Sequence, residues 1–174
     1  ATPADCASHS YKRGRYNHIA PQMVHNNVDV VLGGGTSYLN EECENYLKNS
    51  GYGVFKNDLT GLRSYEGNKM WALFGDGEME YDLDRNPEEQ PSLAEMTTKA
   101  IEKLSKNENG FFLMVEGSLV DHAAHGNDPV GLFSDFLAFD KACGVALDFA
   151  KQNGETAVII VPDHGTGAPS ITGG

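Results

Sequence analysis

The sequence has few cysteines, few basic residues and no long hydrophobic run. No apolar stretch approaches the ~20 residues that a membrane-spanning helix needs. The three cysteines, Cys6, Cys43 and Cys143, are odd in number and widely spaced, which is neither a disulfide framework nor a zinc-finger pattern and leaves the compartment open. Because 13 lysines and arginines stand against 25 acidic residues, the net charge is −12, which argues against a nucleic-acid partner. An anionic substrate is not excluded, since bound metal cations can dominate the local field.

The remaining composition is that of a globular protein. The chain has 174 residues, of which 40% are hydrophobic, too many for a disordered segment. Internal repeats and low-complexity segments are absent from the sequence. We therefore expect residues 1–174 to form a single domain. The chain opens on ATPADCASHS without a methionine, so we expect a mature product or an excised piece.

The first half of the chain reads as short helices and strands separated by turn residues. Thr2 is expected to cap a helix that runs to about Tyr11, and Thr36-Ser37 to cap another that runs to about Lys48. The glycines 33–35 lack both the GxGxxG and the P-loop pattern, so we interpret them as a tight strand-to-helix turn. The other expected elements are a helix from His18 to about residue 27, strands over 28–32, 51–57 and 69–74, and a solvated acidic loop over 75–90.

The second half predicts alternating helices and buried strands. Ser92 and Glu95 form a capping box at the start of a helix over 92–107, and a long helix is expected over about 130–151. Continuous apolar runs at 111–115 and 156–161 predict two buried strands, and the composition of residues 165–174 predicts a flexible tail. Continuous apolar strands between helices are typical of a parallel sheet covered on both faces, which makes the expected fold class α/β.

Both predicted strands end in carboxylates and imidazoles. Glu116, Asp121 and His125 follow the first strand, and Asp163 and His164 follow the second. Ligands of parallel sheets bind beyond the carboxyl ends of the strands, and the Asp-x-x-x-His spacing puts both side chains on one face if 121–125 is helical. Oxygen and imidazole donors together suit Zn²⁺, whereas oxygen donors alone suit Mg²⁺. Each residue alone has an ordinary explanation as a loop carboxylate or a solvated imidazole; their conjunction indicates a metal site.

These residues lie in stretches that resemble the alkaline phosphatase family of metal-dependent phosphate monoester hydrolases. The matching stretches, in the order in which the family has them, are ATPA, DVVLGGG, EQPSLAEMTTKAIEKL, GFFLMVEGSLVDHAAHGNDP and VPDHGTG. The resemblance implies an alkaline-phosphatase-like α/β fold, present in part, with a central mostly parallel sheet flanked by helices. It also implies two Zn²⁺ sites, one Mg²⁺ site and a phosphoserine intermediate.

The resemblance also assigns roles to single residues. Asp121 and His125 match ligands of one zinc, and Asp163 and His164 match ligands of the other. Glu116 and Thr2 match ligands of the magnesium site, so for Thr2 a ligand role competes with its role as a helix cap. Arg13 matches the arginine whose fork grips the substrate phosphate. His122 is similar to an imidazole that some members carry near the magnesium site and the phosphate, where it would tune the site without binding metal.

Parts of the family pattern have no counterpart here. They are the nucleophilic serine in its Asp-Ser-Ala setting, the early aspartate that bridges two metals, and the late histidine that completes the first zinc site. We therefore expect the chain to be an internal segment of a longer enzyme and to be inactive alone. The resemblance further implies a periplasmic or extracellular location, with no targeting signal in the chain, and a homodimer of the full-length enzyme.

Two alternatives stay open. The chain could come from another member of the wider superfamily, such as a phosphodiesterase or a phosphoglycerate mutase, although those proteins do not normally combine VEGSLVDHAAH with an upstream ATPA and arginine. It could also be a non-catalytic metal-binding module on a phosphatase scaffold. The missing serine favours this second alternative, and the intact Arg13 and metal ligands argue against it.

Overall fold

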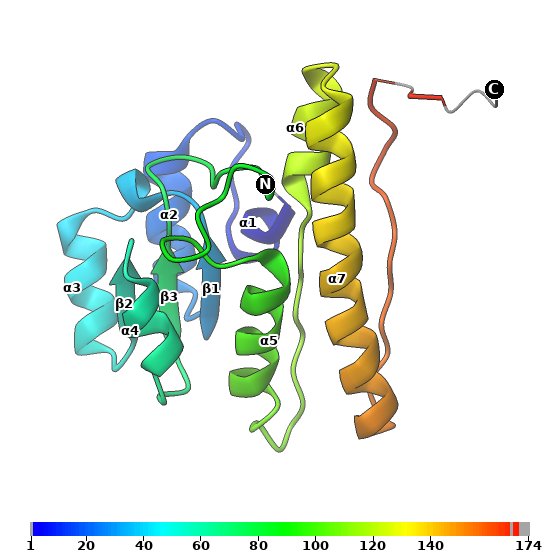
Figure 1. The fold of residues 1–174 in the computed structure, drawn as a ribbon. Coiled ribbons are helices and arrows are strands. Elements are labelled where there is room, and N and C mark those ends of the chain that lie inside the picture. Colours follow the sequence, from blue (N-terminus) through cyan, green and yellow to red (C-terminus); the bar gives the residue numbers. More distant parts are fainter. Residues whose placement is uncertain (1, 168, 171–174) are drawn as a thin grey trace.

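The computed structural model describes residues 2–167 and 169–170 and has an α/β architecture (Figure 1). In chain order its elements are α1 (Thr2–Ala7), α2 (Tyr16–His25), β1 (Val30–Gly33), the 3-10 helix η1 (Thr36–Tyr38), α3 (Glu41–Asn49), β2 (Gly53–Lys56), α4 (Leu59–Ser64), β3 (Met70–Leu73), α5 (Leu93–Leu104), α6 (Ser118–His125) and α7 (Pro129–Asn153). Over the described residues, no helix combines the length and the apolarity needed to cross a bilayer.

A three-stranded parallel sheet forms the centre of the first half, in the order β1-β3-β2. Met70 of β3 pairs with Val30 of β1 on one side and with Gly53 of β2 on the other. Every residue of β3 is buried, as its continuous apolar sequence predicts for a central parallel strand. Side chains of β3 alternate between two cores, with Trp71 packed toward α2 and α3 and Met70 packed toward α4.

Helices α5, α6 and α7 form a second group, in which α7 contacts both α5 and α6 while α5 contacts β1. Side chains cap the starts of two of these helices. Ser92 accepts a hydrogen bond from the backbone N–H of Glu95 at the start of α5, as expected. Asp128 accepts from the N–H groups of Val130 and Gly131 at the start of α7. The helices expected over 92–107 and 130–151 are therefore confirmed, with small shifts of their ends.

The two buried strands expected at 111–115 and 156–161 are not strands in the structure. Both segments are extended and run in the same direction as β3 in Figure 1, but neither belongs to the sheet. The second segment is largely exposed, with Ile159 81% accessible to solvent. An apolar, β-branched sequence favours a strand, yet a strand forms only when a neighbouring strand hydrogen-bonds to its backbone N–H and C=O groups. The fold class is nevertheless confirmed as α/β, because β1, β2 and β3 form a parallel sheet, although not from the apolar runs on which that expectation was based.

Other differences concern where helices begin and end. The helix expected over 36–48 is divided into η1 and α3. The cause is a hydrogen bond of 3.0 Å from the Thr36 hydroxyl to the Gly75 carbonyl oxygen, which binds Thr36 to the acidic loop. Asn40 caps α3 instead, accepting from the N–H of Cys43. Helix α1 contains Thr2 and ends at Ala7, short of Tyr11. Helix α4 was not expected, and the predicted flexible tail lies partly outside the described residues, at 168 and 171–174.

The glycine turn after β1 has a steric cause. A Cβ on Gly34 would collide with the carbonyl oxygen of Gly77, and Gly35 has a φ of +100°. The loop after β3 therefore packs directly against this turn, in which only glycine fits without strain. This agrees with the interpretation of residues 33–35 as a tight turn.

Candidate metal centre

Helix α6 carries three of the candidate residues, Asp121, His122 and His125, on two turns. The helix begins after Gly117 and ends at His125. The chain then reverses sharply into α7, with the backbone N–H of Asp128 donating to the Ala123 carbonyl oxygen over 2.9 Å. The antiparallel packing of α6 on α7 therefore holds this short helix in place.

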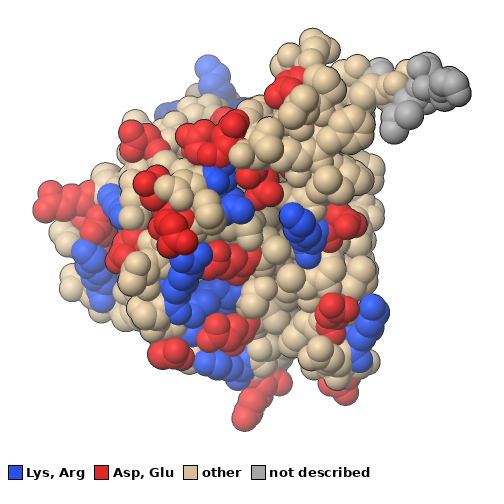
Figure 2. All heavy atoms as spheres, viewed as in Figure 1, with Lys and Arg blue, Asp and Glu red and all other residues tan. Residues whose placement is uncertain are grey.

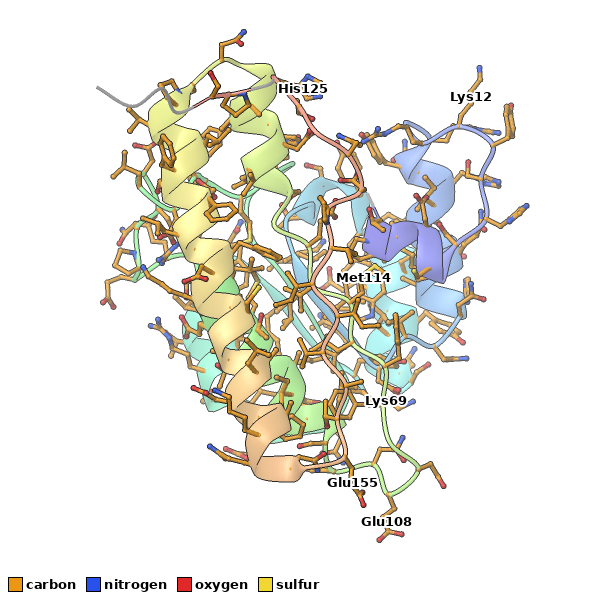
Figure 3. All side chains as sticks on the ribbon, turned by 90° about the vertical axis from the view of Figure 1, so that its right-hand side faces the viewer. Lys12, Lys69, Glu108, Met114, His125 and Glu155 are labelled. Carbon is orange, nitrogen blue, oxygen red and sulfur yellow. The ribbon has the colours of Figure 1, made fainter. Side chains whose placement is uncertain are left out.

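Asp121 and His125 lie one turn apart on the same face of α6. Nε2 of His125 is 3.6 Å from Oδ2 of Asp121. The spacing of four residues thus places both side chains on one face of the helix, as expected. Both side chains are partly accessible, with exposed fractions of 38% for Asp121 and 70% for His125, so they can meet a ligand from solvent. Figure 3 shows His125 at the end of α6, next to the C-terminal segment of the chain.

The segment after the second extended run meets α6 at Asp121. The hydroxyl of Thr166 donates to Oδ1 of Asp121 over 2.6 Å and lies 3.0 Å from Nδ1 of His164. Because a hydroxyl has one hydrogen, Thr166 accepts from Nδ1–H of His164 while it donates to Asp121. This arrangement leaves Nε2 as the nitrogen of His164 that can bind a metal. Nε2 also lies 3.2 Å from Oδ2 of Asp163.

Gly167 allows this segment to approach α6. Its φ is +68°, and a Cβ at this position would lie 2.7 Å from the backbone carbonyl oxygen of Ala124. A larger residue would therefore push the segment 163–167 away from the helix. The close packing explains how His164, far from α6 in the sequence, comes to lie near Asp121, with Asp163 next to His164.

Asp121 is the carboxylate that joins the two parts of the site. The hydrogen bond from the Thr166 hydroxyl lowers the pKa of Asp121 below its ordinary value. Partial burial acts in the opposite direction, and the neighbouring imidazoles of His125 and His164 add to the lowering. The carboxylate is therefore ionised over the whole physiological range, which is the state that binds a metal cation.

A second group of candidate residues surrounds a cavity of about 980 Å³. Arg13, Glu116 and His122 all line this cavity. Nδ1 of His122 is 3.0 Å from Oε2 of Glu78, which lines the cavity as well. Thr2 is the exposed first residue of α1, and its neighbour Pro3 belongs to the cavity wall.

The candidate side chains are neighbours rather than a formed coordination sphere. Within residues 2–167 and 169–170, no group of three or more His, Cys, Asp or Glu side chains converges closely enough to hold one metal ion. Asp121, His125, Asp163 and His164 contact one another in pairs instead. Their oxygen and imidazole nitrogen donors are nevertheless the types that Zn²⁺ takes in proteins.

Sequence reasoning missed two residues of this region. Thr166 follows directly after Asp-His-Gly, and its hydroxyl could have been considered as a partner for the nearby candidates. Glu78, the partner of His122, stands in the acidic run that we interpreted as a solvated loop. Nothing in that run distinguishes Glu78 from its acidic neighbours.

The family model for alkaline phosphatase matches residues 1–174. Alkaline phosphatase 3 of Bacillus subtilis is 40% identical over 180 residues, covering 98% of this chain and 38% of the relative. The cold-active alkaline phosphatase of the psychrophile Shewanella sp. has a TM-score of 0.82 at 33% identity, covering 88% of this chain and 38% of that one.

A third similar protein is a histidine mutant of the alkaline phosphatase from the Antarctic bacterium TAB5, with Mg bound in its M3 site. It has a TM-score of 0.72 at 32% identity and covers 88% of this chain and 45% of that one. The chain thus spans less than half the length of these relatives. With a family model matched along the whole chain and structural neighbours of the same kind, the chain belongs to the alkaline phosphatase family.

Proposed function

We propose that this chain contributes metal-binding and phosphate-binding residues to an enzyme that hydrolyses phosphate monoesters. The observation that carries the proposal is the meeting of α6 with the segment 163–167. There Thr166 joins Asp121 to His164, while His125 lies one helical turn from Asp121. Candidate donors from two distant parts of the sequence thereby meet in pairs on the surface, and an ordinary solvated loop needs no such arrangement.

Family membership suggests two zinc ions and one magnesium ion as cofactors, and the donor types in this chain suit both metals. Asp121 and His125 would hold one zinc, and Asp163 and His164 the other. Glu116 and Thr2 would contribute oxygen ligands to magnesium, the metal named for the M3 site of the TAB5 mutant. When bound, such metals supply a coordinated hydroxide at neutral pH and stabilise developing negative charge.

The remaining roles belong to side chains around the cavity. Arg13 would hold two oxygens of a substrate phosphate with its guanidinium fork, and it lines the same cavity as Glu116 and His122. His122 would hold Glu78 and shape the field around the phosphate without binding a metal itself. Arg13 would thereby offset part of the charge of a dianionic substrate in a protein whose net charge is −12.

The finer features of the proposal follow from family membership. Reaction through a phosphoserine needs a serine in an Asp-Ser-Ala setting, which residues 1–174 do not contain. The chain matches only 38% of the B. subtilis relative, so we propose that polypeptide outside these residues supplies the nucleophile. A homodimer and a periplasmic or extracellular location are proposed on the same basis.

Zinc binding to the chain tests the metal assignment directly. Purified apo-protein would be titrated with Zn²⁺ in competition with a chromophoric chelator, and the bound metal would be counted by mass spectrometry. We expect His125→Ala and Asp121→Ala to weaken zinc binding by at least about tenfold. The matched control is His18→Ala, which removes an exposed imidazole from α2, away from the candidate residues.

A separate measurement tests catalysis. The isolated chain should not turn over a chromogenic phosphate monoester, whereas a complete enzyme carrying these residues should do so and should lose most of its activity with Arg13→Ala. Equal zinc binding by His125→Ala and His18→Ala would disprove the metal assignment. Clear turnover by the isolated chain would disprove the proposal that the nucleophile lies elsewhere.

A further inference from the structure

Two sulfur atoms meet where α1 lies against the extended segment 111–117. The thiol of Cys6, in the last turn of α1, is 3.8 Å from the thioether sulfur of Met114. Figure 3 shows Met114 in that segment, next to α1. The two residues are 108 positions apart in the sequence, so the fold and not local spacing brings their sulfurs together. Neither residue is among the candidate ligands of zinc or magnesium.

Both backbones are held in place by contacts of their own. The side-chain amide of Asn26, just after α2, donates to the carbonyl oxygen of Ala7 over 2.9 Å and so fastens the end of α1. The segment 111–117 is held against α7 at its start, where the ring of Phe111 packs on that of Phe149 with 6.0 Å between their centroids. The surrounding fold therefore sets the positions of the two sulfurs.

The distance between the sulfurs suits a metal ion shared by both. With metal–sulfur bonds of about 2.3 Å, the length found in zinc thiolates, two sulfurs 3.8 Å apart subtend an angle of about 110° at the metal. This angle is close to that of a tetrahedral site. Cys6 is exposed and Met114 is partly buried, and both line the cavity of about 980 Å³. A cation can therefore reach the pair from solvent.

The chemistry of the two donors selects the metal. Thiolate and thioether sulfurs are soft ligands, and together they favour Cu(I). Zn²⁺ takes thiolate, imidazole and carboxylate ligands in proteins. Among the residues that the structure describes, Cys6 belongs to no group of three or more His, Cys, Asp or Glu side chains that could hold a metal ion. The cavity offers further soft donors instead, because Met23, Met79 and Met96 line it as well.

We propose that Cys6 and Met114 form a binding site for one Cu(I) ion, with the Cys6 thiolate and the Met114 thioether as its ligands. Binding releases the thiol proton to solvent, and neither the sulfur nor the copper changes its oxidation state. The site uses none of the donors that pair around Asp121. It therefore does not depend on the proposed phosphatase function.

The test is a titration of the 174-residue chain with Cu(I), without oxygen and in competition with a chromophoric Cu(I) chelator. We expect Cys6→Ser to remove the site. Met114→Leu should weaken it by at least about tenfold, because even the loss of a partner outside the coordination sphere typically costs about 10- to 100-fold in metal affinity. Met70→Leu is the matched control, since it makes the same change in β3, outside the cavity wall. Far-UV circular dichroism would show that the variants are folded.

Two further measurements use the unsubstituted chain. Cu(I) should slow alkylation of the exposed Cys6, with Cys143, which does not line the cavity, as the internal reference. An excess of Zn²⁺ should leave this protection unchanged, because a thioether is a poor ligand for zinc. X-ray absorption should show two sulfur neighbours around the bound copper, and one fewer in Met114→Leu.

Three results would overturn the proposal. Equal Cu(I) affinity of Met114→Leu and Met70→Leu would mean that Cys6 binds copper as a lone thiolate. Full affinity of Cys6→Ser would place the copper elsewhere in the chain. Displacement of the copper by Zn²⁺ would assign it to the candidate zinc ligands. Because the readouts are copper affinity and thiol protection rather than turnover of a phosphate ester, these failures are distinguishable from a failure of the proposed function.

Discussion

Replacing Thr166 with valine removes the hydroxyl that joins the two parts of the candidate metal centre. Valine keeps the shape of threonine but cannot donate to Asp121 or accept from His164. The segment 163–167 would then be held against α6 mainly by the packing of Gly167 on Ala124. We expect Thr166→Val to loosen the position of His164 and to weaken zinc binding.

The size of the effect follows from the bond that is lost. A hydrogen bond to a charged group is worth about 1.5–3 kcal/mol, and because Asp121 is 38% exposed, water replaces part of it. We therefore expect a loss of about 1–2 kcal/mol, which corresponds to a roughly 5- to 30-fold weaker zinc affinity. The pKa of Asp121 should also rise, because the bond from Thr166 is the main cause of its lowering. Because the ordinary pKa of this carboxyl is 3.8, it stays ionised between pH 5 and pH 8, and the weaker zinc affinity of the variant should persist over that whole range.

The assay is a zinc competition titration of the chain between pH 5 and pH 8. Thr166→Ser is the matched control, since it keeps the hydroxyl and should bind zinc almost normally. If Thr166→Val binds zinc as tightly as Thr166→Ser at every pH, the hydroxyl does not organise the site and the reasoning is refuted.

Three further predictions concern stability and packing. Burial raises the pKa of Asp135. Ionisation of this carboxyl therefore destabilises the fold as the pH rises above the pKa of about 3.9 that it has in the unfolded chain. Asp135→Asn should raise the midpoint of urea unfolding at pH 7 but not at pH 3. Lys103 is fully buried and donates to the Tyr65 carbonyl oxygen, so Lys103→Ala should lower the unfolding free energy by about 2–4 kcal/mol in the same assay. Gly167→Ala should weaken zinc binding in the competition titration, whereas Gly144→Ala, with open space around it in α7, should stabilise the chain by about 1 kcal/mol.

Local signals in the sequence were sufficient for much of the fold. The cap of α5 was predictable because the Ser92 side chain accepts a hydrogen bond from the backbone N–H of Glu95, only three residues later in the sequence. The α/β class was predicted from the apolar runs 111–115 and 156–161, which are not strands in the structure, whereas the observed sheet consists of β1, β2 and β3, which were expected only as short strands. The start of α3 was not predictable, because Thr36 binds the distant Gly75 and leaves Asn40 to cap the helix. Contacts between residues far apart in the sequence set where that helix begins, and local helix propensity cannot predict such contacts.

The candidate site was predictable to a similar extent. The spacing of its carboxylates and imidazoles in the sequence indicated the candidate residues, and the predicted helical turn between Asp121 and His125 is present. Thr166 was missed because its role depends on the fold of 163–167 against α6. The apolar run 111–115 was assigned to a strand on composition alone, but hydrogen bonding in a sheet needs a partner that composition cannot supply. The metal roles of these residues remain predictions.

The exposed extended segment 156–161 also affects how the chain behaves in solution. Its sequence, TAVIIV, is uncharged, rich in β-branched residues and free of proline and glycine, which is the composition that forms stacked cross-β assemblies. Glu155 precedes it, at the lower end of the view in Figure 3, and Pro162 and Asp163 follow it. A charge and a proline at the ends of such a run oppose stacking of identical chains. Figure 2 shows few charged side chains along α7 compared with the rest of that face. Protection against aggregation in this part of the molecule therefore depends largely on the residues that flank the segment. Glu155→Val or Pro162→Val should make the isolated chain less soluble at high concentration.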